Sequence, residues 1–412
     1  MRFVDSRKPR ATSVGKSLME NVLWTVFGIL LFSGFCNFVL ISGRHRYARH
    51  GVASETGLRV RVLDAFDVFN STSYFCGLDS LRAFSVIAVI WTHVTNQNAT
   101  GLLSQGDKGV DLFFAISGFL VTTLLLREFN REGRISLRDF YVRRTLRIFP
   151  LYYAVLGLYC VLVFLTLRNT PKASEFWSNL PAFATFTSNW FVDLANGADH
   201  GVTFYFAWSL AVEEQFYLFW PMLMVFLLCK VKSYWLLLLA AVILIGAQIL
   251  AANHGDVMFF AKAIGSLAPP ILMGASFAVV LNRRAGFNAL YSVLGNRFAA
   301  PAAGVLLLVL LQSEAQAILI QLVMATLVAS VCMREDTFLH PILTWRPAVF
   351  VGTISYGVYL MHMLAANLVR KVLGHTMGID VFIITTLLVI GVAWLSFKYF
   401  EAPLIRFGRR QR

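Results

Sequence analysis

The sequence predicts an all-α integral membrane protein, with a core of ten transmembrane helices and one additional N-terminal hydrophobic helix. The chain has 412 residues, of which 58% are hydrophobic and only 14% are charged. Its mean hydropathy of +0.66 is rare for a soluble domain. Apolar stretches also recur along the whole chain, and as helices most are long enough to cross a hydrocarbon core of roughly 30 Å. Together these observations indicate that the fold is embedded in a lipid bilayer.

Eleven apolar stretches are the predicted spans, because each is bounded by polar or basic residues. They are 22–42, 78–97, 109–126, 148–168, 204–229, 233–252, 258–281, 299–312, 315–333, 348–371 and 379–400. A weaker stretch at 179–192 is interpreted as an interfacial or re-entrant piece. The five cysteines show no CxxC spacing, so neither a disulfide nor a metal site is predicted.

Arginine and lysine placement predicts the orientation, since cytoplasmic loops carry an excess of these residues. The strongest signal is the loop after 109–126, which is expected in the cytoplasm together with the basic tail at 406–412. The net charge of +14 is spread over such short loops, where it contacts membrane lipids, and a nucleic-acid partner is not expected. The predicted location is the cell membrane, which is the inner membrane in a Gram-negative bacterium.

The domain organisation follows from these spans. Residues 78–405 form the membrane domain, preceded by a basic N-terminal tail (1–21), the extra hydrophobic segment (22–42) and a basic linker (43–77). Both flanks of the extra segment are basic. The sequence therefore leaves open whether this segment crosses the membrane or lies in the interface.

Arg82 and His93 are the most informative ionisable pair, because charged or titratable groups inside spans are costly and are functional candidates. They are eleven residues apart, which on an α-helix returns to within roughly 20° of the same direction and separates them by about 16 Å along the axis. The two residues therefore lie on the same face of the helix, at different depths in the membrane. The alternative is that Arg82 snorkels to the headgroups while His93 hydrogen-bonds a neighbouring helix.

Three arginines, Arg143, Arg144 and Arg147, precede Pro150 at the membrane surface. Arg143 and Arg147 are four residues apart and project from one side of a helix. The planar guanidinium fork bonds two oxygens at once and suits phosphate. Ordinary positive-inside charge explains the number of arginines in this loop, but it does not require the cluster to lie beneath the same leaflet as Arg82.

Acidic and aromatic residues supply the remaining candidates. Glu213 and Glu214 follow Trp208 and Ser209 in an aromatic-rich span, where one glutamate could pair with His93 or Arg82 or form a structural ion pair. Asp111 is in the first turn of its helix, where the helix dipole alone favours an acid. Two further residues, Tyr356 and His362, lie in a segment that by itself is interpreted as a helix-packing face of glycine and serine with one satisfied histidine.

Six segments in order resemble the acyltransferase family 3 membrane proteins, the group that includes O-antigen and other polysaccharide O-acetylases. They are LDSLRAFSVIAVIWTH, GVDLFFAISGFLVT, RRTLRIFPLYY, WSLAVEEQFYLFWP, GTISYGVYLMH and FEAP, within residues 75–405. No GxSxG elbow, Walker loop, HExxH, dinucleotide fingerprint or HxxxxD box is present. The resemblance implies a ten-helix domain that transfers an acyl group from cytosolic acyl-CoA to a hydroxyl, usually on a sugar.

The resemblance assigns roles to these residues. His93 is the expected general base, with Glu213 or Asp111 supporting it, because burial keeps a histidine neutral and an acid fixes its tautomer. The CoA phosphates of the donor, expected to be acetyl-CoA, are assigned to Arg143, Arg144 and Arg147, with Arg82 guiding the pantetheine. The acceptor, a glycan or lipid-linked sugar, is expected near a last set of residues: Trp208, Ser209, Glu214, Tyr356 and His362.

Two alternatives stay open at this point. The chain stops soon after FEAP, so the extracytoplasmic SGNH-type domain of some relatives is not expected, and a separate extracytoplasmic partner could supply it. The rival function is a transporter or flippase of a lipid-linked sugar, in which Arg82, His93 and Glu213 would line a passage. Inverted repeats and paired broken helices, which are typical of transporters, are not evident in the sequence.

Overall fold

The protein is described here from a computed structural model, which covers residues 65–95, 100–192, 203–252 and 268–409. These residues form helices, turns and loops, with no strand among them, which confirms the predicted all-α class for this part of the chain. The N-terminal tail at 1–21, the extra hydrophobic segment at 22–42 and most of the linker at 43–77 lie outside the described residues.

The helices follow the apolar stretches of the sequence. A short α2 (Ala65–Ser71) leads into α3 (Cys76–Val94), and two 3₁₀ turns precede α4. The remaining helices are α4 (Gly109–Glu132), α5 (Leu137–Thr166), α6 (Pro171–Ala184), α7 (Ser188–Phe191), α9 (Ala207–Met224), α10 (Tyr234–Ala252), α12 (Pro269–Leu281), α13 (Arg284–Leu294), α14 (Ala299–Gln312), α15 (Ala317–Met333), α16 (His340–Leu343), α17 (Arg346–Thr353), α18 (Ser355–Leu373), α19 (Ile379–Ser396) and α20 (Ala402–Arg409).

Several helices suit a membrane by length and composition. Four are long and apolar enough to cross, and the number rises to seven if each of three sharply bent helix pairs counts as one span. Three shorter apolar helices lie among them, Tyr234–Gly246, Pro269–Leu281 and Ala317–Met333. The chain is therefore a multi-pass membrane protein, while the count of ten core spans plus one stays a prediction.

Two of the predicted spans differ clearly from the structure. The span predicted at 148–168 begins earlier, at Leu137, because the Ser136 hydroxyl accepts a hydrogen bond from the Asp139 backbone N–H and caps the helix. The span predicted at 348–371 is two helices, α17 and α18, which are bent by 77°. Packing explains the second difference, because Gly352 in α17 lies directly against the backbone carbonyl of Asp79 in α3.

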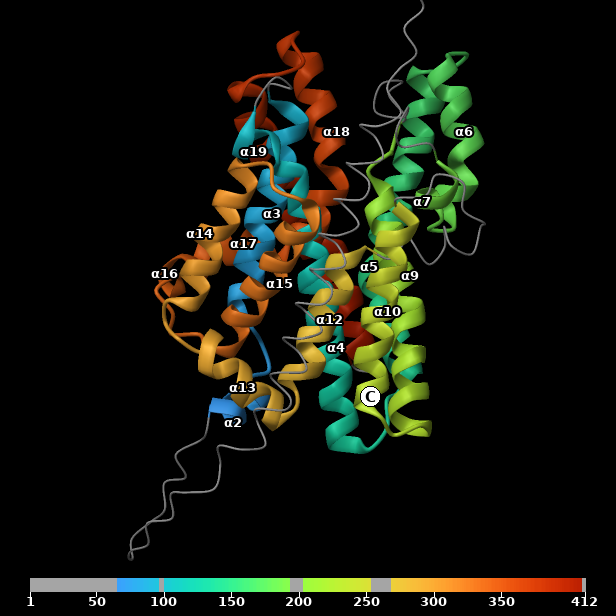
Figure 1. The fold of residues 1–412 in the computed structure, drawn as a ribbon. Coiled ribbons are helices and arrows are strands. Elements are labelled where there is room, and N and C mark those ends of the chain that lie inside the picture. Colours follow the sequence, from blue (N-terminus) through green and yellow to red (C-terminus); the bar gives the residue numbers. More distant parts are fainter. Residues whose placement is uncertain (1–64, 96–99, 193–202, 253–267, 410–412) are drawn as a thin grey trace, which may run out of the picture.

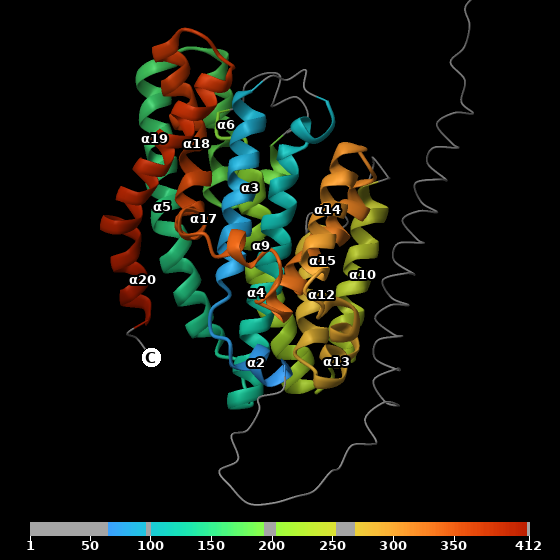
Figure 2. The same cartoon turned by 90° about the vertical axis from the view of Figure 1, so that its left-hand side faces the viewer.

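The helices form an elongated bundle whose two ends carry different elements (Figures 1 and 2). The outer turns of α6, α18 and α19 lie toward one end, and α2 and α13 lie at the other. Two buried hydrophobic clusters fill the interior. The first includes α4, α12 and α15, and the second includes α5, α18 and residues of α3.

A very close helix crossing joins α4 and α12 and depends on two glycines. A Cβ atom at Gly118 would lie 1.8 Å from the Ile271 carbonyl oxygen, and one at Gly274 would lie 2.1 Å from that of Ala115. Backbone cannot move aside as a flexible side chain can. Small residues at such crossings let two helix backbones approach closely in a membrane protein.

Gly118→Val is therefore expected to destabilise the purified protein, because overpacking a tight contact costs about 1–3 kcal/mol or more. The measurement is the thermal unfolding midpoint in detergent. Gly157→Val in α5 is the matched control, since a Cβ atom there meets no other atom within 4 Å. Equal midpoints for the two variants would contradict the tight crossing.

Candidate active site

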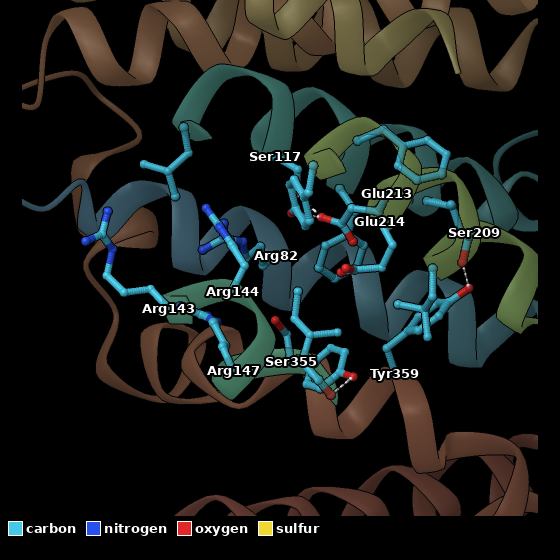
Figure 3. Close-up of a pocket in the computed structure, with 18 of the residues that line it drawn as sticks. Arg82, Ser117, Arg143, Arg144, Arg147, Ser209, Glu213, Glu214, Ser355 and Tyr359 are labelled. Atoms are coloured by element: carbon cyan, nitrogen blue, oxygen red, sulfur yellow. Dashed lines mark hydrogen bonds between the residues drawn. The ribbon is translucent and has the colours of Figure 1, made fainter. Parts of the chain in front are cut away.

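A cavity of about 280 Å³ lies where the two hydrophobic clusters meet. Phe114 and Tyr217 of the first cluster and Leu210 and Tyr359 of the second line its wall. Its polar lining comes from α3, α4, α5, α9 and α18. Arginines gather toward one side of it, and carboxylates and hydroxyls occupy the middle and the other side (Figure 3).

The arginine side brings together Arg82 from α3 and Arg143, Arg144 and Arg147 from α5 (Figure 3). Arg143 lies 3.8 Å from the Glu128 carboxylate. The Arg144 guanidinium lies over the Tyr217 ring, 4.7 Å from its centroid. Arg147 is exposed at the cavity. Within the described residues no carboxylate lies within ion-pair distance of Arg144 or Arg147, so both are available to an anionic ligand.

Arg82 is held by an acid that the sequence reasoning missed. Its guanidinium lies 3.0 Å from Asp79, one turn earlier on α3, and the Tyr74 hydroxyl donates a second hydrogen bond to the same carboxylate. Asp79 is 7% exposed. The three-residue spacing of Asp79 and Arg82 was the available signal, since such residues are neighbours on a helix.

Asp79→Asn is expected to lower the stability of the protein by about 1–3 kcal/mol, because it leaves the largely buried Arg82 guanidinium without its charge partner. The measurement is the thermal unfolding midpoint in detergent. Asp107→Asn is the control, since the Asp107–Lys108 ion pair is more exposed, with 59% of the Asp107 side chain accessible. A midpoint for Asp79→Asn that matches this control would show that the pair contributes little.

Glu213 occupies the middle of the cavity and is held by two hydroxyls. Ser117 of α4 and Tyr217 of α9 both donate hydrogen bonds to its Oε1 atom. Glu214, the next residue, also lines the cavity. A carboxylate that accepts two such hydrogen bonds is stabilised in its place. The structure thus fixes Glu213 between α4 and α9, in the same cavity as the four arginines.

The hydroxyl side of the cavity is formed by Ser209 and two tyrosines of α18. The Ser209 and Tyr359 hydroxyls are 2.6 Å apart, and Tyr356 donates to the Ile148 carbonyl at 2.8 Å. Trp208 instead packs its ring edge-to-face on Phe114, with ring centroids 6.2 Å apart, and is absent from the described cavity lining. Of the residues assigned to the acceptor, Ser209, Glu214 and Tyr356 thus share the cavity.

His93 lies further along α3, beside a second histidine. Its Nδ1 atom is 2.8 Å from the Val89 carbonyl oxygen, which can only accept, so Nδ1 carries the hydrogen and Nε2 bears the lone pair. The His362 ring lies 5.1 Å from the His93 ring, centroid to centroid. Neither histidine is among the described residues that line the cavity. They connect to it through Tyr359, whose backbone carbonyl accepts from His362.

The predicted acids lie elsewhere. Asp111 accepts a hydrogen bond from the Gln321 side chain at 3.2 Å, and Glu213 is occupied by Ser117 and Tyr217. No carboxylate of the described residues lies within ion-pair distance of His93. The Val89 carbonyl of the same helix takes the place that we expected an acid to fill, because it already lies one turn below the ring.

Two more residues near the site were not predicted. Arg370 donates to the His93 carbonyl at 2.6 Å and to the Thr376 carbonyl at 2.8 Å. It therefore binds the end of α3 to the end of α18. Glu401 of the FEAP segment is buried beside α18 and accepts from Ser396 at 3.1 Å. Its position beside Gly357 could not be read from a four-residue motif.

Comparison with known proteins shows the family of the chain. A family model described as an acyltransferase domain matches residues 76–398. The chain belongs to acyltransferase family 3. The match begins at the first residue of α3 and extends into the π-helical segment Phe397–Glu401 after α19, so it contains every residue that lines the cavity except Ile405.

Curated relatives of this acyltransferase family 3 chain include bacterial enzymes. The chain is 30% identical over 375 residues to "Peptidoglycan O-acetyltransferase OatA" of Listeria monocytogenes, which covers 82% of this chain and 57% of that protein. It is 29% identical over 367 residues to "Putative peptidoglycan O-acetyltransferase YrhL" of Bacillus subtilis, with 82% and 56% covered. The chain thus spans little more than half the length of these relatives. No solved structure matches.

Proposed function

We propose that the protein is a membrane O-acyltransferase that moves an acetyl group from cytosolic acetyl-CoA to a hydroxyl of a glycan or glycolipid. The observation that carries the proposal is the cavity itself. It presents arginines at one side and hydroxyls at the other, and its far wall touches the His93–His362 pair through Tyr359. A polyanionic donor requires cationic groups and a neutral acceptor requires hydrogen-bonding groups, and this cavity contains both kinds.

The donor would enter at the arginine side. CoA carries its phosphates on one end and its thioester on the other, so phosphates on Arg143, Arg144 and Arg147 leave the pantetheine arm directed past Arg82. We place this side toward the cytoplasm, where acyl-CoA is found and where the basic loop and the C-terminal tail are expected. Asp79 supports the role of Arg82, because its ion pair fixes the guanidinium at the cavity wall.

The chemistry requires one base and one proton route. The acceptor hydroxyl gives its proton to Nε2 of His93, its oxygen attacks the thioester carbonyl, the carbon–sulfur bond breaks, and the departing thiolate of CoA takes the proton. Nε2 is the nitrogen available for this, because Nδ1 donates to Val89. Since His93 is one layer behind the described cavity wall, the acceptor would approach it from the end that carries the outer turns of α18 and α19 (Figure 1).

For Glu213 we propose a role other than the one expected from the sequence. Its carboxylate is held by Ser117 and Tyr217 and faces the arginine cluster, so we propose that it balances the positive charge of the cavity when no donor is bound. The relatives named as peptidoglycan O-acetyltransferases support a glycan acceptor for this chain. A separate extracytoplasmic partner remains part of the proposal.

The decisive experiment incubates the purified protein in detergent with acetyl-CoA labelled in the acetyl group and with peptidoglycan fragments or lipid-linked sugars. We expect the label to move to the glycan and free CoA thiol to appear in equal amount. A transporter or flippase would release no thiol. Mass spectrometry of the glycan, read for one added acetyl mass, identifies the acceptor class. Absence of label transfer and of thiol release with every acceptor would overturn the proposal.

A further inference from the structure

We propose that His362 acts through His93. When the acceptor hydroxyl is deprotonated, the Nε2 lone pair of His362 stabilises the imidazolium that forms on His93. The inference rests on the proposed acyltransferase function and gives it a second residue. His362 would not touch the substrate, and it would add to the support that the Val89 carbonyl gives to His93 through Nδ1.

The first observation is the burial and bonding of His362. Its side chain is completely buried, with 0% exposure. Its Nδ1 atom faces the Tyr359 carbonyl oxygen, which can only accept, so Nδ1 carries the hydrogen. Its Nε2 atom is buried and has no hydrogen-bond partner in the described structure. A buried acceptor without a donor is costly to leave in place unless it is used at some stage of the reaction.

The second observation is the matching state of His93. Both rings use Nδ1 on a carbonyl of their own helix, and both therefore keep the Nε2 lone pair. The rings lie 5.1 Å apart between centroids. At that separation the two rings are neighbours in a buried region, so a charge that forms on one is felt by the dipole of the other. Burial keeps both rings neutral at rest, and a second proton on the pair would place two like charges side by side.

The charged and titratable groups around the pair favour a single proton. Arg370 of α18 is bound to the His93 carbonyl, so a fixed cation already lies at this end of the helix. Tyr205 faces His93, and Tyr359 faces His362. Asp107 before α4 is the acid whose field reaches His93, and it lies outside hydrogen-bond distance in the described structure. Beside the Val89 carbonyl, which already holds the Nδ1 hydrogen, the neutral ring of His362 is thus a neighbour able to stabilise an imidazolium on His93.

The proton balance is unchanged by this role. The hydroxyl proton moves to His93 Nε2 as the oxygen attacks the thioester, and it returns to sulfur when the carbon–sulfur bond breaks. His362 gains no proton at the end of the cycle. It is a positioning residue for the charge on His93, so its loss should slow the chemical step without weakening donor binding.

The test compares wild type, His362→Asn and His362→Gln in the label-transfer assay. Asn and Gln keep a polar N–H donor and remove the imidazole lone pair. We expect kcat to fall about 10- to 100-fold, with the KM for acetyl-CoA unchanged. The acid limb of the pH–rate profile should also move to lower pH, because the imidazolium of His93 loses the stabilising lone pair of His362. His375→Asn is the control, since His375 is an exposed histidine that pairs with Asp380 at 2.8 Å.

The outcomes separate the two levels of the proposal. If the wild type is active and both variants keep the wild-type kcat and acid limb, the role of His362 is overturned. The acyltransferase function then still stands. Absence of transfer by wild type overturns the function itself. If neither variant folds, a titration of wild-type protein carrying ¹⁵N-labelled histidine decides. One proton shared by two rings supports the role, and two independent protonations contradict it.

Discussion

Replacing His93 by asparagine is expected to lower kcat for acyl transfer about 10²- to 10⁴-fold, the range that a positioned general base contributes. Asparagine retains a polar N–H donor for the Val89 carbonyl but has no basic nitrogen at the Nε2 position. The KM for acetyl-CoA should change little, because the donor phosphates are assigned to arginines on α5. The measurement is steady-state label transfer by the purified protein.

His340→Asn is the control for this experiment. His340 also bonds a backbone carbonyl through Nδ1, that of Glu335 at 2.9 Å, but it is the exposed first residue of α16 and does not line the described cavity. Its substitution should leave kcat unchanged. A His93→Asn protein that folds and still transfers label at the wild-type rate would remove His93 from the mechanism.

The second large effect is expected at Arg147. Arg147→Ala should raise the KM for acetyl-CoA about 10- to 100-fold, because hydrogen bonds to charged groups contribute about 1.5–3 kcal/mol each. A truncated donor, S-acetylpantetheine, carries no phosphate and should be used equally by wild type and variant. Arg147→Lys should recover part of the loss, because lysine keeps the charge but loses the planar fork. The measurement is the KM for each donor.

Arg138→Ala provides the matched control, because Arg138 is exposed in the first turn of the same helix and does not line the described cavity. Its KM for acetyl-CoA should equal that of wild type. If Arg147→Ala lost as much activity with S-acetylpantetheine as with acetyl-CoA, the residue would not act on the phosphates. The assignment of the arginine side to CoA would then be wrong.

Much of the fold could be predicted because the solvent is lipid. Backbone groups in hydrocarbon must bond within a segment, so long apolar runs become helices, and α14 spans the same residues, 299–312, as predicted. Breaks within an apolar run were not predictable. The bend between α17 and α18 depends on Gly352 packing on Asp79, a contact between residues far apart in the chain.

For the candidate site, too, some features could be predicted from local sequence and others could not. Arg143, Arg144 and Arg147 lie on successive turns of one helix, so local geometry was enough to place them together. The partners of Glu213 and the neighbour of His93 come from other helices, Ser117 from α4 and His362 from α18. The structure also places Arg82 in the cavity and His93 behind its wall, although the two share a face of α3.

By itself, the sequence determined the all-α membrane class, the family and the arginine cluster, because hydropathy, ordered motifs and helical spacing are local properties. Only the tertiary structure decided which side chains meet. Asp79 pairs with Arg82, Glu213 is held by hydroxyls, and His93 faces a second histidine. The physical reason is that a buried polar group is stabilised by whichever partner packing brings within reach, and helix packing is not encoded in any one segment.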